Sequence, residues 1–347
     1  MCNMHQFSIC IIRLSSLGDI ILTTPLIRAI RKAFPDACID MIIADHFTEV
    51  IQNNPHIDNV LTINTKSGMI DFFQQMLSLR KEKPKYDVVI DVHDSIRSKI
   101  LRLYLGKKWF TYDKYRSLKK ALVHDKHRIP LHDIIPVPLR YFSAVSAFPQ
   151  IQPDSKGAEF WLPNEIQSAP LYPPDSKSNN EISNCIAMCP GAHHATKRWP
   201  IEYYITLATF IHNKMGKNII LLGSQNDIDI CNDIERTLPF RINNQAGKCT
   251  LIETAILMDS CDAIICNDSG LMHVASSRRR PTIVIYGSTV PDFGFIPFHT
   301  KNSIVESDIP CRPCTHIGLS TCPEQHFNCM NSIKPEQVFK KLEDLLS

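Results

Sequence analysis

A carboxylate and a set of small polar residues lie together near the start of the chain, in residues 13–20 with the sequence RLSSLGDI. Ser15, Ser16 and Gly18 allow a tight turn and leave backbone amides available to an anion or a polar substrate. Asp19 follows at the start of a predicted helix. Its carboxylate has two interpretations: it caps the helix and interacts with the helix dipole, or it is a general base that removes a proton from a substrate hydroxyl.

A pair of cations marks a second segment, residues 190–200 with the sequence PGAHHATKRWP. Lys197 and Arg198 lie on a loop that follows a predicted strand, and two cations at a strand end suit a diphosphate. Alternatively, Arg198 and Trp199 pack and pair at the surface. Lys197 is therefore the stronger candidate for a phosphate contact.

A third segment, residues 267–273 with the sequence NDSGLMH, joins another predicted strand to a helix. Ser269 and Gly270 would offer amide hydrogens at the helix N-terminus, an arrangement that suits phosphate oxygens. Asp268 would orient this loop or bind a sugar hydroxyl. In the alternative interpretation, the Asp and Ser side chains only cap the helix.

Two common nucleotide-binding patterns are missing from the sequence. Its 12 glycines form neither G-x-G-x-x-G nor G-x-x-x-x-G-K-[ST]. Dinucleotide-dependent dehydrogenases and P-loop kinases therefore lose support.

Apolar runs rich in Ile and Val alternate with segments of helical periodicity. The predicted strands are residues 9–14, 38–44, 60–63, 87–92, 185–189, 218–222, 263–266 and 282–286. The predicted helices are residues 20–34, 47–53, 69–83, 201–215, 227–237, 251–259 and 273–277. This alternation predicts an α/β fold in which each parallel sheet has helices on both sides. We expect two Rossmann-like domains that face a cleft, with ligands beyond the carboxyl ends of the strands.

The length of 347 residues is about twice that of a usual domain. A segment rich in Pro, Ser and Asn, residues 169–182, is typical of a linker. The sequence therefore predicts a first domain over residues 1–168, a second over 183–330, and a C-terminal helix over 331–347.

The composition is that of an ordinary globular protein, with 44% hydrophobic and 21% charged residues. This excludes a disordered or coiled-coil chain. A formal charge of 38 − 35 = +3 gives no reason to expect a nucleic-acid partner. We expect a cytosolic protein, because no basic cluster precedes the first apolar run and no apolar segment is long enough to cross a bilayer.

The 13 cysteines do not indicate a disulfide framework. Cys10, Cys185, Cys189 and Cys266 fall in strand-like apolar runs, where a reduced thiol behaves as a small hydrophobic group. Near the end, four further cysteines are interleaved with two histidines, which is enough ligands for a tetrahedral metal site. The spacing of Cys311, Cys314, Cys322 and Cys329 is not that of a common zinc finger, and we favour reduced structural thiols.

Taken together, the three polar segments resemble glycosyltransferase family nine, the ADP-heptose:lipopolysaccharide heptosyltransferases. The resemblance rests on residues 13–20, 190–192, 197–200, 267–275 and 286–289, and it extends over about residues 8–340. It implies a GT-B architecture, with the acceptor on the first domain and the nucleotide sugar on the second. It also implies inverting transfer with neither metal nor cofactor.

The resemblance assigns roles to individual residues. Asp19 would remove the proton of the acceptor hydroxyl, and Ser15, Ser16 and Gly18 would contact the acceptor. The donor contacts would come from residues of the second domain: Ala192, His193, Lys197, Asp268, Ser269, Gly270 and His273. Fixed positive charge and amide dipoles at those positions would stabilise the anionic leaving group.

A basic stretch over residues 97–128 has eleven Lys or Arg and two Asp, a local charge of +9. Such a stretch can bind phosphorylated glycolipid head groups at an anionic membrane surface. The resemblance implies that the acceptor binds here, with Arg97 and Lys99 as candidate contacts. Solvated surface charge and a nucleic-acid patch are the alternatives, the latter without a recognisable reading motif.

Together with the resemblance, these observations predict an enzyme that moves a heptose from ADP-heptose to the inner core of lipopolysaccharide, in peripheral contact with the cytoplasmic membrane face. One alternative is a related transferase that uses another nucleotide sugar. Another is a non-catalytic protein that binds a nucleotide sugar.

Overall fold

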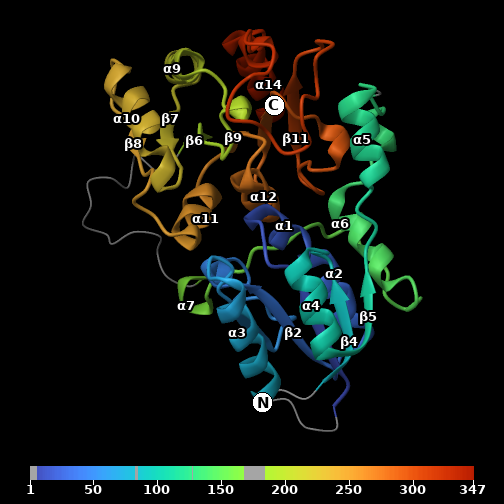
Figure 1. Cartoon of the computed structure of the whole chain (residues 1–347). Coiled ribbons are helices and arrows are strands. Elements are labelled where there is room, and N and C mark those ends of the chain that lie inside the picture. The colour runs from blue at the N-terminus through green and yellow to red at the C-terminus, as the bar shows by residue number, and fades with distance from the viewer. Residues whose placement is uncertain (1–5, 83–84, 127, 168–183) are drawn as a thin grey trace. The chain divides into compact units, whose positions relative to one another are not determined.

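The computed structural model describes residues 6–82, 85–126, 128–167 and 184–347. The chain divides into two compact units (Figure 1). The first unit comprises Met1–Lys114 and Ile135–Pro163, and the second comprises Tyr115–Ile134 and Asn164–Ser347. Residues 115–134 thus belong to the second unit, whereas the sequence-based division put them in the first. The predicted linker over residues 169–182 lies outside the described residues.

The described residues of the first unit form a five-stranded parallel sheet in the order β3-β2-β1-β4-β5. Its strands are β1 (Ser8–Ile12), β2 (Cys38–Ala44), β3 (Asn59–Ile63), β4 (Tyr86–Asp91) and β5 (Gly106–Thr111). β1 lies in the middle, with Ile9 opposite Ile39 of β2 and Val88 of β4. Both faces of β1 are covered, which explains its unbroken apolar run.

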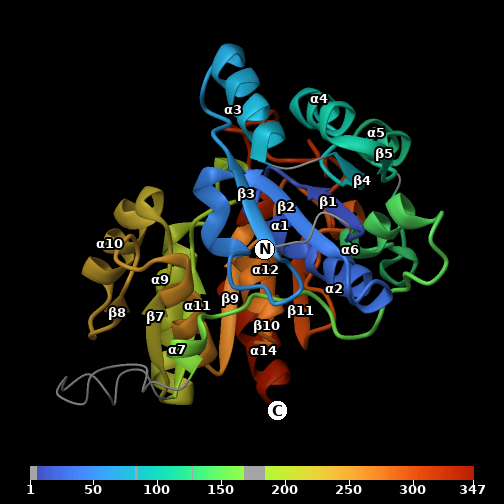
Figure 2. The same ribbon diagram turned by 90° about the horizontal axis from the view of Figure 1, so that it is seen from below.

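Helices cover the two faces of this sheet (Figure 2). They are α1 (Leu17–Leu22), α2 (Thr24–Ala33), the 3₁₀ helix η1 (Asp45–Val50), α3 (Met69–Glu82), α4 (Ile96–Leu105), α6 (Val137–Arg140) and the 3₁₀ helix η3 (Tyr141–Val145). The buried residues Phe72 and Met76 of α3 and Leu101 and Leu105 of α4 share one core cluster. These two helices therefore pack against the same part of the sheet.

The single helix predicted over residues 20–34 is in fact two helices, α1 and α2, that meet at Thr23. Pro25 has no amide hydrogen and cannot donate to the carbonyl of Ile21. The Thr24 hydroxyl donates to that carbonyl instead, at 2.7 Å. The break leaves α1 as a short helix whose first turn carries Asp19.

The second unit contains a six-stranded parallel sheet in its described residues, in the order β11-β10-β9-β6-β7-β8. The strands are β6 (Cys185–Cys189), β7 (Asn218–Leu221), β8 (Asn243–Asn244), β9 (Ala263–Asn267), β10 (Thr282–Tyr286) and β11 (Asn302–Glu306). Trp199 is buried in the core of this unit, where its indole donates to the carbonyl of Ile333 at 3.0 Å. This packing anchors the loop that follows β6.

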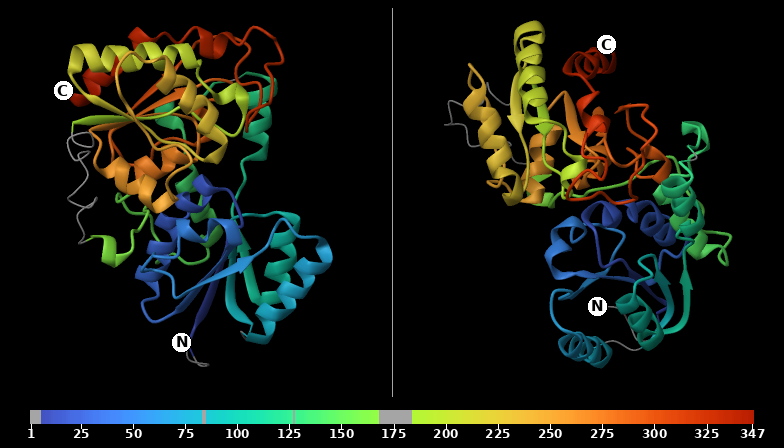
Figure 3. Two further views of the ribbon diagram at one scale, coloured as in Figure 1. Left: turned by 90° about the vertical axis from the view of Figure 1, so that its left-hand side faces the viewer. Right: turned by 45° about the horizontal axis from the view of Figure 1, so that its top comes forward.

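Helices on both sides of this second sheet complete the unit (Figure 3). The α-helices are α5 (Arg116–His124), α7 (Asn164–Gln167), α9 (Ile201–Phe210), α10 (Ile228–Thr237), α11 (Leu251–Asp259), α12 (Gly270–Ser277), α13 (Asn328–Asn331) and α14 (Pro335–Leu346). The short helices are η2 (Leu131–Asp133), η4 (Ala195–Lys197), η5 (Ile211–Met215), η6 (Gln225–Asp227) and η7 (Pro291–Phe293). The helix predicted over residues 201–215 continues from α9 as the π-helix η5 and ends at Gly216, whose φ of 61° suits glycine.

The strand order places the candidate loops at the switch point of each sheet. In the first sheet the chain runs outward from β1 to β3 and then returns to β4 beside β1. In the second sheet β6 and β9 are neighbours in the same way. Ligands of open α/β sheets bind beyond the carboxyl ends of the strands at such points. The loops after β1, β4, β6 and β9 all begin there.

Cys10, Cys185, Cys189 and Cys266 are buried and none of them forms a disulfide bond, which confirms the prediction for these four thiols. Near the end of the chain, the Cys311 sulfur lies 4.0 Å from His326 Nε2. Within the described residues, however, no three His, Cys, Asp or Glu side chains are grouped so that they could hold a metal ion. Among all the helices that the structure describes, none is both long enough and apolar enough to span a bilayer.

Candidate functional site

Asp19 is held by an ion pair and several hydrogen bonds beyond the carboxyl end of β1. Its Oδ1 lies 2.5 Å from Arg13 Nη2 and accepts a hydrogen bond from the Tyr141 hydroxyl at 3.3 Å. Its Oδ2 accepts bonds from the Ser16 hydroxyl at 2.8 Å and from the Ser16 amide at 3.3 Å. Asp19 thus forms the capping box of α1, and it is also part of a partly buried ion pair. A capping role alone would not require the Arg13 and Tyr141 contacts.

Arg13 is fixed in place by the backbone around it. Its Nε donates to the Ser15 carbonyl at 2.6 Å, and its Nη1 donates to the Val92 carbonyl at 2.5 Å. Burial lowers the pKa of this guanidinium, but the charge of Asp19 and the other nearby groups outweigh burial and the net pKa is raised. Arg13 therefore stays charged and holds the Asp19 carboxylate in one orientation.

A pocket of about 420 Å³ opens beside this ion pair, entirely within the first unit. We call it the Ser15 pocket; it is lined by Leu14, Ser15, Thr65, His93, Ser95, Ile96 and Arg97. Arg97 donates to the Ser67 carbonyl at 3.2 Å and lies over the Phe72 ring, while its buried Nε has no partner among the described residues. Ser15 and Arg97, two predicted acceptor contacts, thus line the same pocket.

The other predicted acceptor contacts are placed differently. Lys99 does not line the Ser15 pocket, and its ammonium lies 3.6 Å from Asp94 on the exposed side of α4. Gly18 is buried in the first turn of α1. Ser16 is exposed and bonds to Asp19, so of these three residues only Ser16 contacts the candidate base.

His93 is a site residue that sequence reasoning missed. It follows β4 at the switch point, and its buried Nδ1 has no hydrogen-bond partner among the described residues. The pKa of His93 is lowered to about 4, mainly because the ring is buried and also because Arg13 and Lys114 are positively charged. The imidazole is therefore neutral at physiological pH and adds a polar group without charge to the pocket.

This neutral histidine predicts a measurable pH dependence of stability. Because its folded-state pKa lies below the unfolded value, its contribution is complete above the unfolded pKa of 6.5 and is lost as the pH falls toward the folded pKa of about 4. Between about pH 7 and about pH 5, the wild type should lose about 2 kcal/mol of unfolding free energy that His93→Gln retains. Urea titrations of both proteins at each pH measure this difference. Equal losses in the two proteins would contradict the buried neutral state.

In the second unit, Lys197 and Asp268 form an ion pair. Lys197 Nζ lies 2.6 Å from Asp268 Oδ2, and the two side chains are 15% and 10% exposed. The Thr289 hydroxyl donates to the same Asp268 oxygen at 2.7 Å. The loops after β6, β9 and β10 thus meet at one carboxylate. The predicted donor contacts Lys197 and Asp268 are in direct contact.

Hydroxyl and amide groups brace these loops. The Ser288 hydroxyl donates to Thr196 Oγ1 at 2.8 Å, and the Leu319 amide donates to the same oxygen at 2.8 Å. Asn267, at the end of β9, holds the loop after β6 at two points, because it donates to the Pro190 carbonyl at 2.8 Å and accepts from the Trp199 amide at 3.2 Å. The bracing fixes the backbone on both sides of Lys197.

The N-terminus of α12 lies next to this ion pair in the sequence. Ser269 is the N-cap residue, and its side chain makes no capping hydrogen bond. Ser269 thus occupies the N-cap position without a capping bond from its side chain. Gly270 begins the helix, and His273, one turn further on, is buried with its ring 6.2 Å from that of Phe295.

The remaining predicted donor contacts lie on the loop after β6. Ala192 is buried and its carbonyl accepts from Arg198 Nε at 2.8 Å, whereas His193 is exposed and its ring contacts that of His194. The bond from Arg198 to the Ala192 carbonyl lies within one loop, so it has a structural role there. Gly191 allows this loop to pass close to Asp227, because a Cβ at position 191 would lie 2.1 Å from Asp227 Oδ1.

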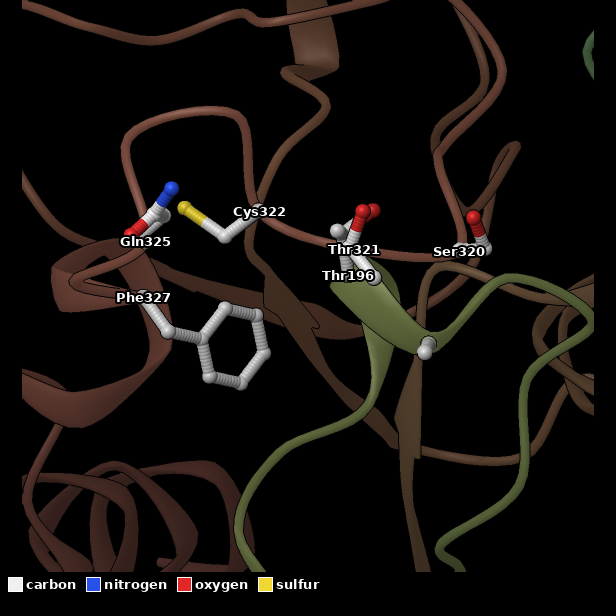
Figure 4. Close-up of a pocket in the computed structure, with 7 residues that line it drawn as sticks. Thr196, Ser320, Thr321, Cys322, Gln325 and Phe327 are labelled. Carbon is white, nitrogen blue, oxygen red and sulfur yellow. The ribbon is translucent and has the colours of Figure 1, made fainter.

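A second pocket, of about 360 Å³, adjoins the Thr196 loop in the second unit. It is lined by Ala195, Thr196, Ser320, Thr321, Cys322, Gln325 and Phe327. Figure 4 shows the Cys322 sulfur turned toward Gln325, with the Phe327 ring below them. Because Thr196 also bonds to Ser288, this pocket shares a wall with the braced loops.

Two parallel Rossmann-like sheets, each with its polar loops at the switch point, are typical of the GT-B fold. The crystal structure of the glycosyl transferase family 9 from Veillonella parvula DSM 2008 is similar with a TM-score of 0.79 and 21% identity, covering 100% of this chain and 99% of that chain. E. coli ADP-heptose lps heptosyltransferase II is similar with a TM-score of 0.71 and 22% identity, covering 98% of each chain. These comparisons confirm the predicted fold.

The family follows from the sequence. The model of glycosyltransferase family 9 (heptosyltransferase) matches residues 76–326, and the chain belongs to this family. Lipopolysaccharide heptosyltransferase 2 of Escherichia coli (strain K12) is 27% identical over 97% of this chain and 98% of the relative. The protein is thus a glycosyltransferase, as its three loops predict.

Proposed function

We propose that this enzyme transfers a heptose from ADP-heptose to the inner core of lipopolysaccharide, with inversion at the anomeric carbon and Asp19 as the general base. The observation that carries the proposal is the Asp19 carboxylate, which Arg13, Ser16 and Tyr141 restrain beyond the end of β1 beside the Ser15 pocket. The names of its relatives, lipopolysaccharide heptosyltransferases, support the choice of substrates.

The first unit would bind the acceptor in this proposal. The phosphate or carboxylate groups of an inner-core glycolipid suit the guanidinium of Arg97, and its hydroxyl groups suit Ser15 and the neutral His93. Ser16 would lie beside the reacting hydroxyl, because its own hydroxyl already bonds to Asp19 Oδ2. Gly18 would act by allowing the tight start of α1.

The second unit would bind the donor. Lys197 would pair with the diphosphate, and the amides of Ser269 and Gly270 would donate to its oxygens at the start of α12. Asp268 would position Lys197 through their ion pair. Ala192 and His193 on the β6 loop, and His273 on α12, would complete the donor contacts.

The proposed reaction uses Asp19 of the first unit and the donor contacts of the second unit. The acceptor hydroxyl oxygen bonds to the anomeric carbon as the bond from that carbon to the diphosphate oxygen breaks. The hydroxyl proton passes to Asp19, and the electron pair of the broken bond leaves with ADP. Lys197 and the α12 amides stabilise the added negative charge on ADP. Attack on the face opposite the leaving group inverts the configuration.

A screen of nucleotide sugars by thermal shift tests the choice of donor. A ligand that binds only the folded protein raises its melting temperature, so ADP-heptose and ADP should give larger shifts than UDP- or GDP-sugars. A larger shift with a UDP- or GDP-sugar would identify a related transferase with another donor. A shift with ADP-heptose but no transfer to a lipopolysaccharide acceptor would identify a non-catalytic binder.

A further inference from the structure

The exposed side of α3 carries an apolar strip, next to the exposed polar residues Asp71, Gln74 and Ser78. Ile70, Phe73 and Leu77 lie three and four residues apart, and they are 75%, 42% and 47% exposed. The inward face of the same helix is apolar as well, because Phe72 and Met76 belong to the core of the first unit. Exposed apolar side chains that repeat at this spacing form a strip along the helix, and such a strip is typical of a contact surface. Packing within the chain accounts only for the inward face.

Exposed apolar side chains continue onto the neighbouring elements. Ile96 and Leu103 of α4 and Trp109 of β5 are also exposed. α3 and α4 lie side by side in Figures 2 and 3, and Arg97 of α4 bonds to Ser67 just before α3. We call this surface the α3–α4 face; it comprises Met69, Ile70, Phe73, Leu77, Ile96, Leu103 and Trp109.

Cations accompany this apolar surface. Of the acids described in residues 66–109 only Asp71 is exposed, whereas six lysines are exposed among the described residues of that range: Lys66, Lys81, Lys85, Lys99, Lys107 and Lys108. Three of the acids already form ion pairs: Asp87 with Lys107, and Asp91 and Asp94 with Arg102. Lys81 at the end of α3 and Lys108 on β5 are exposed. Positive charge around exposed apolar side chains matches an anionic lipid surface better than an uncharged protein partner.

The α3–α4 face also reaches the Ser15 pocket. Ile96 belongs to both, and Arg97, the next residue of α4, lines the pocket. A substrate anchored in a bilayer by its lipid would present its head group close to the membrane surface. A protein docked through this face would therefore hold the pocket near that head group.

We propose that the α3–α4 face docks on an anionic membrane surface, with Ile70, Phe73 and Leu77 entering the head-group region and the surrounding lysines contacting lipid phosphates. This inference rests on the proposed function, because it supplies the route by which a glycolipid acceptor reaches the Ser15 pocket. It assigns membrane contact to a defined helix face rather than to the whole basic stretch.

Vesicle flotation tests the proposal directly. The full-length protein should float with vesicles of phosphatidylethanolamine and phosphatidylglycerol, and it should float much less with phosphatidylcholine vesicles or at high salt. Replacing Ile70, Phe73 and Leu77 together by Ser should lower the partition coefficient by about tenfold or more. The matched control is the pair Leu131→Ser and Ile317→Ser, which removes two equally exposed apolar side chains of the second unit and should leave partitioning unchanged.

Several results would overturn the proposal: equal flotation of the triple variant and the wild type, absence of wild-type flotation, or equal binding to neutral and anionic vesicles. A concentration-dependent dimer that the triple variant abolishes would also overturn it, because a second copy would then cover the face. Transfer to a water-soluble, delipidated acceptor separates this proposal from the function itself. The triple variant should retain that activity, and loss of vesicle binding with retained transfer supports the docking role.

Discussion

Asp19→Asn should reduce the transfer rate by about 10²–10⁴-fold, because the amide cannot accept the proton of the acceptor hydroxyl. Donor affinity, measured by calorimetry, should change little, since Lys197 and the α12 loop belong to the other unit. Asn keeps a carbonyl oxygen that can accept the Ser16 hydrogen bonds, so the capping of α1 is largely preserved. Asp19→Ala should abolish transfer as well, with a larger loss of stability.

Glu253→Gln is the matched control for the loss of a capping-box carboxylate. Glu253 caps α11 together with Thr250, in the same arrangement that Asp19 forms with Ser16. This control should retain full transfer activity. Unchanged turnover of Asp19→Asn would remove Asp19 from the mechanism, whereas a rate loss shared by both variants would indicate a purely structural effect of capping.

Lys197→Ala should weaken donor binding by roughly 10- to 150-fold, because a hydrogen bond between charged groups contributes about 1.5–3 kcal/mol. The loss should be larger for ADP-heptose and ADP than for adenosine, which has no phosphate. The variant also leaves Asp268 without its ammonium partner, so its melting temperature should fall. Calorimetry with ADP and with adenosine measures both effects on affinity.

Lys217→Ala is the matched control for this ion pair. Lys217 pairs with Asp262 at 2.5 Å in the same unit, away from the loops after β6, β9 and β10, and its side chain is about as exposed as that of Lys197. The donor affinity of the Lys217→Ala variant should equal that of the wild type. An undisturbed ADP affinity in Lys197→Ala would count against the phosphate role and would leave Lys197 as a structural partner of Asp268.

The central strands were predictable because burial on both faces produces long apolar runs. β6, β10 and α11 have the predicted bounds. The edge strand β5 was missed, since its sequence GKKWFT places two lysines in the strand. Lysines on an edge strand prevent pairing with another chain, and they also remove the apolar signal. The helix break at Thr23 had a local signal in Pro25 that the apolar periodicity obscured.

The basic stretch over residues 97–128 illustrates a limit of local interpretation. The stretch crosses from the first unit to the second at Tyr115, so its charges do not form one surface of one domain. Arg102 is buried against Asp91, and Arg128 pairs with Asp292 and Glu306. These cations have structural partners that the sequence alone could not identify. Arg97, by contrast, does line the Ser15 pocket.

The sequence by itself determined the alternation of strands and helices, the three polar loops at strand ends and the family that they indicate. Only the tertiary structure decided the partners of the reactive groups: Tyr141 and His93 beside Asp19 and Arg13, and Asp268 with Thr289 on Lys197. The physical reason is that parallel strands bring the carboxyl ends of distant segments to one edge of a sheet. Local patterns predict which segments end there, but the strand order determines which of them become neighbours.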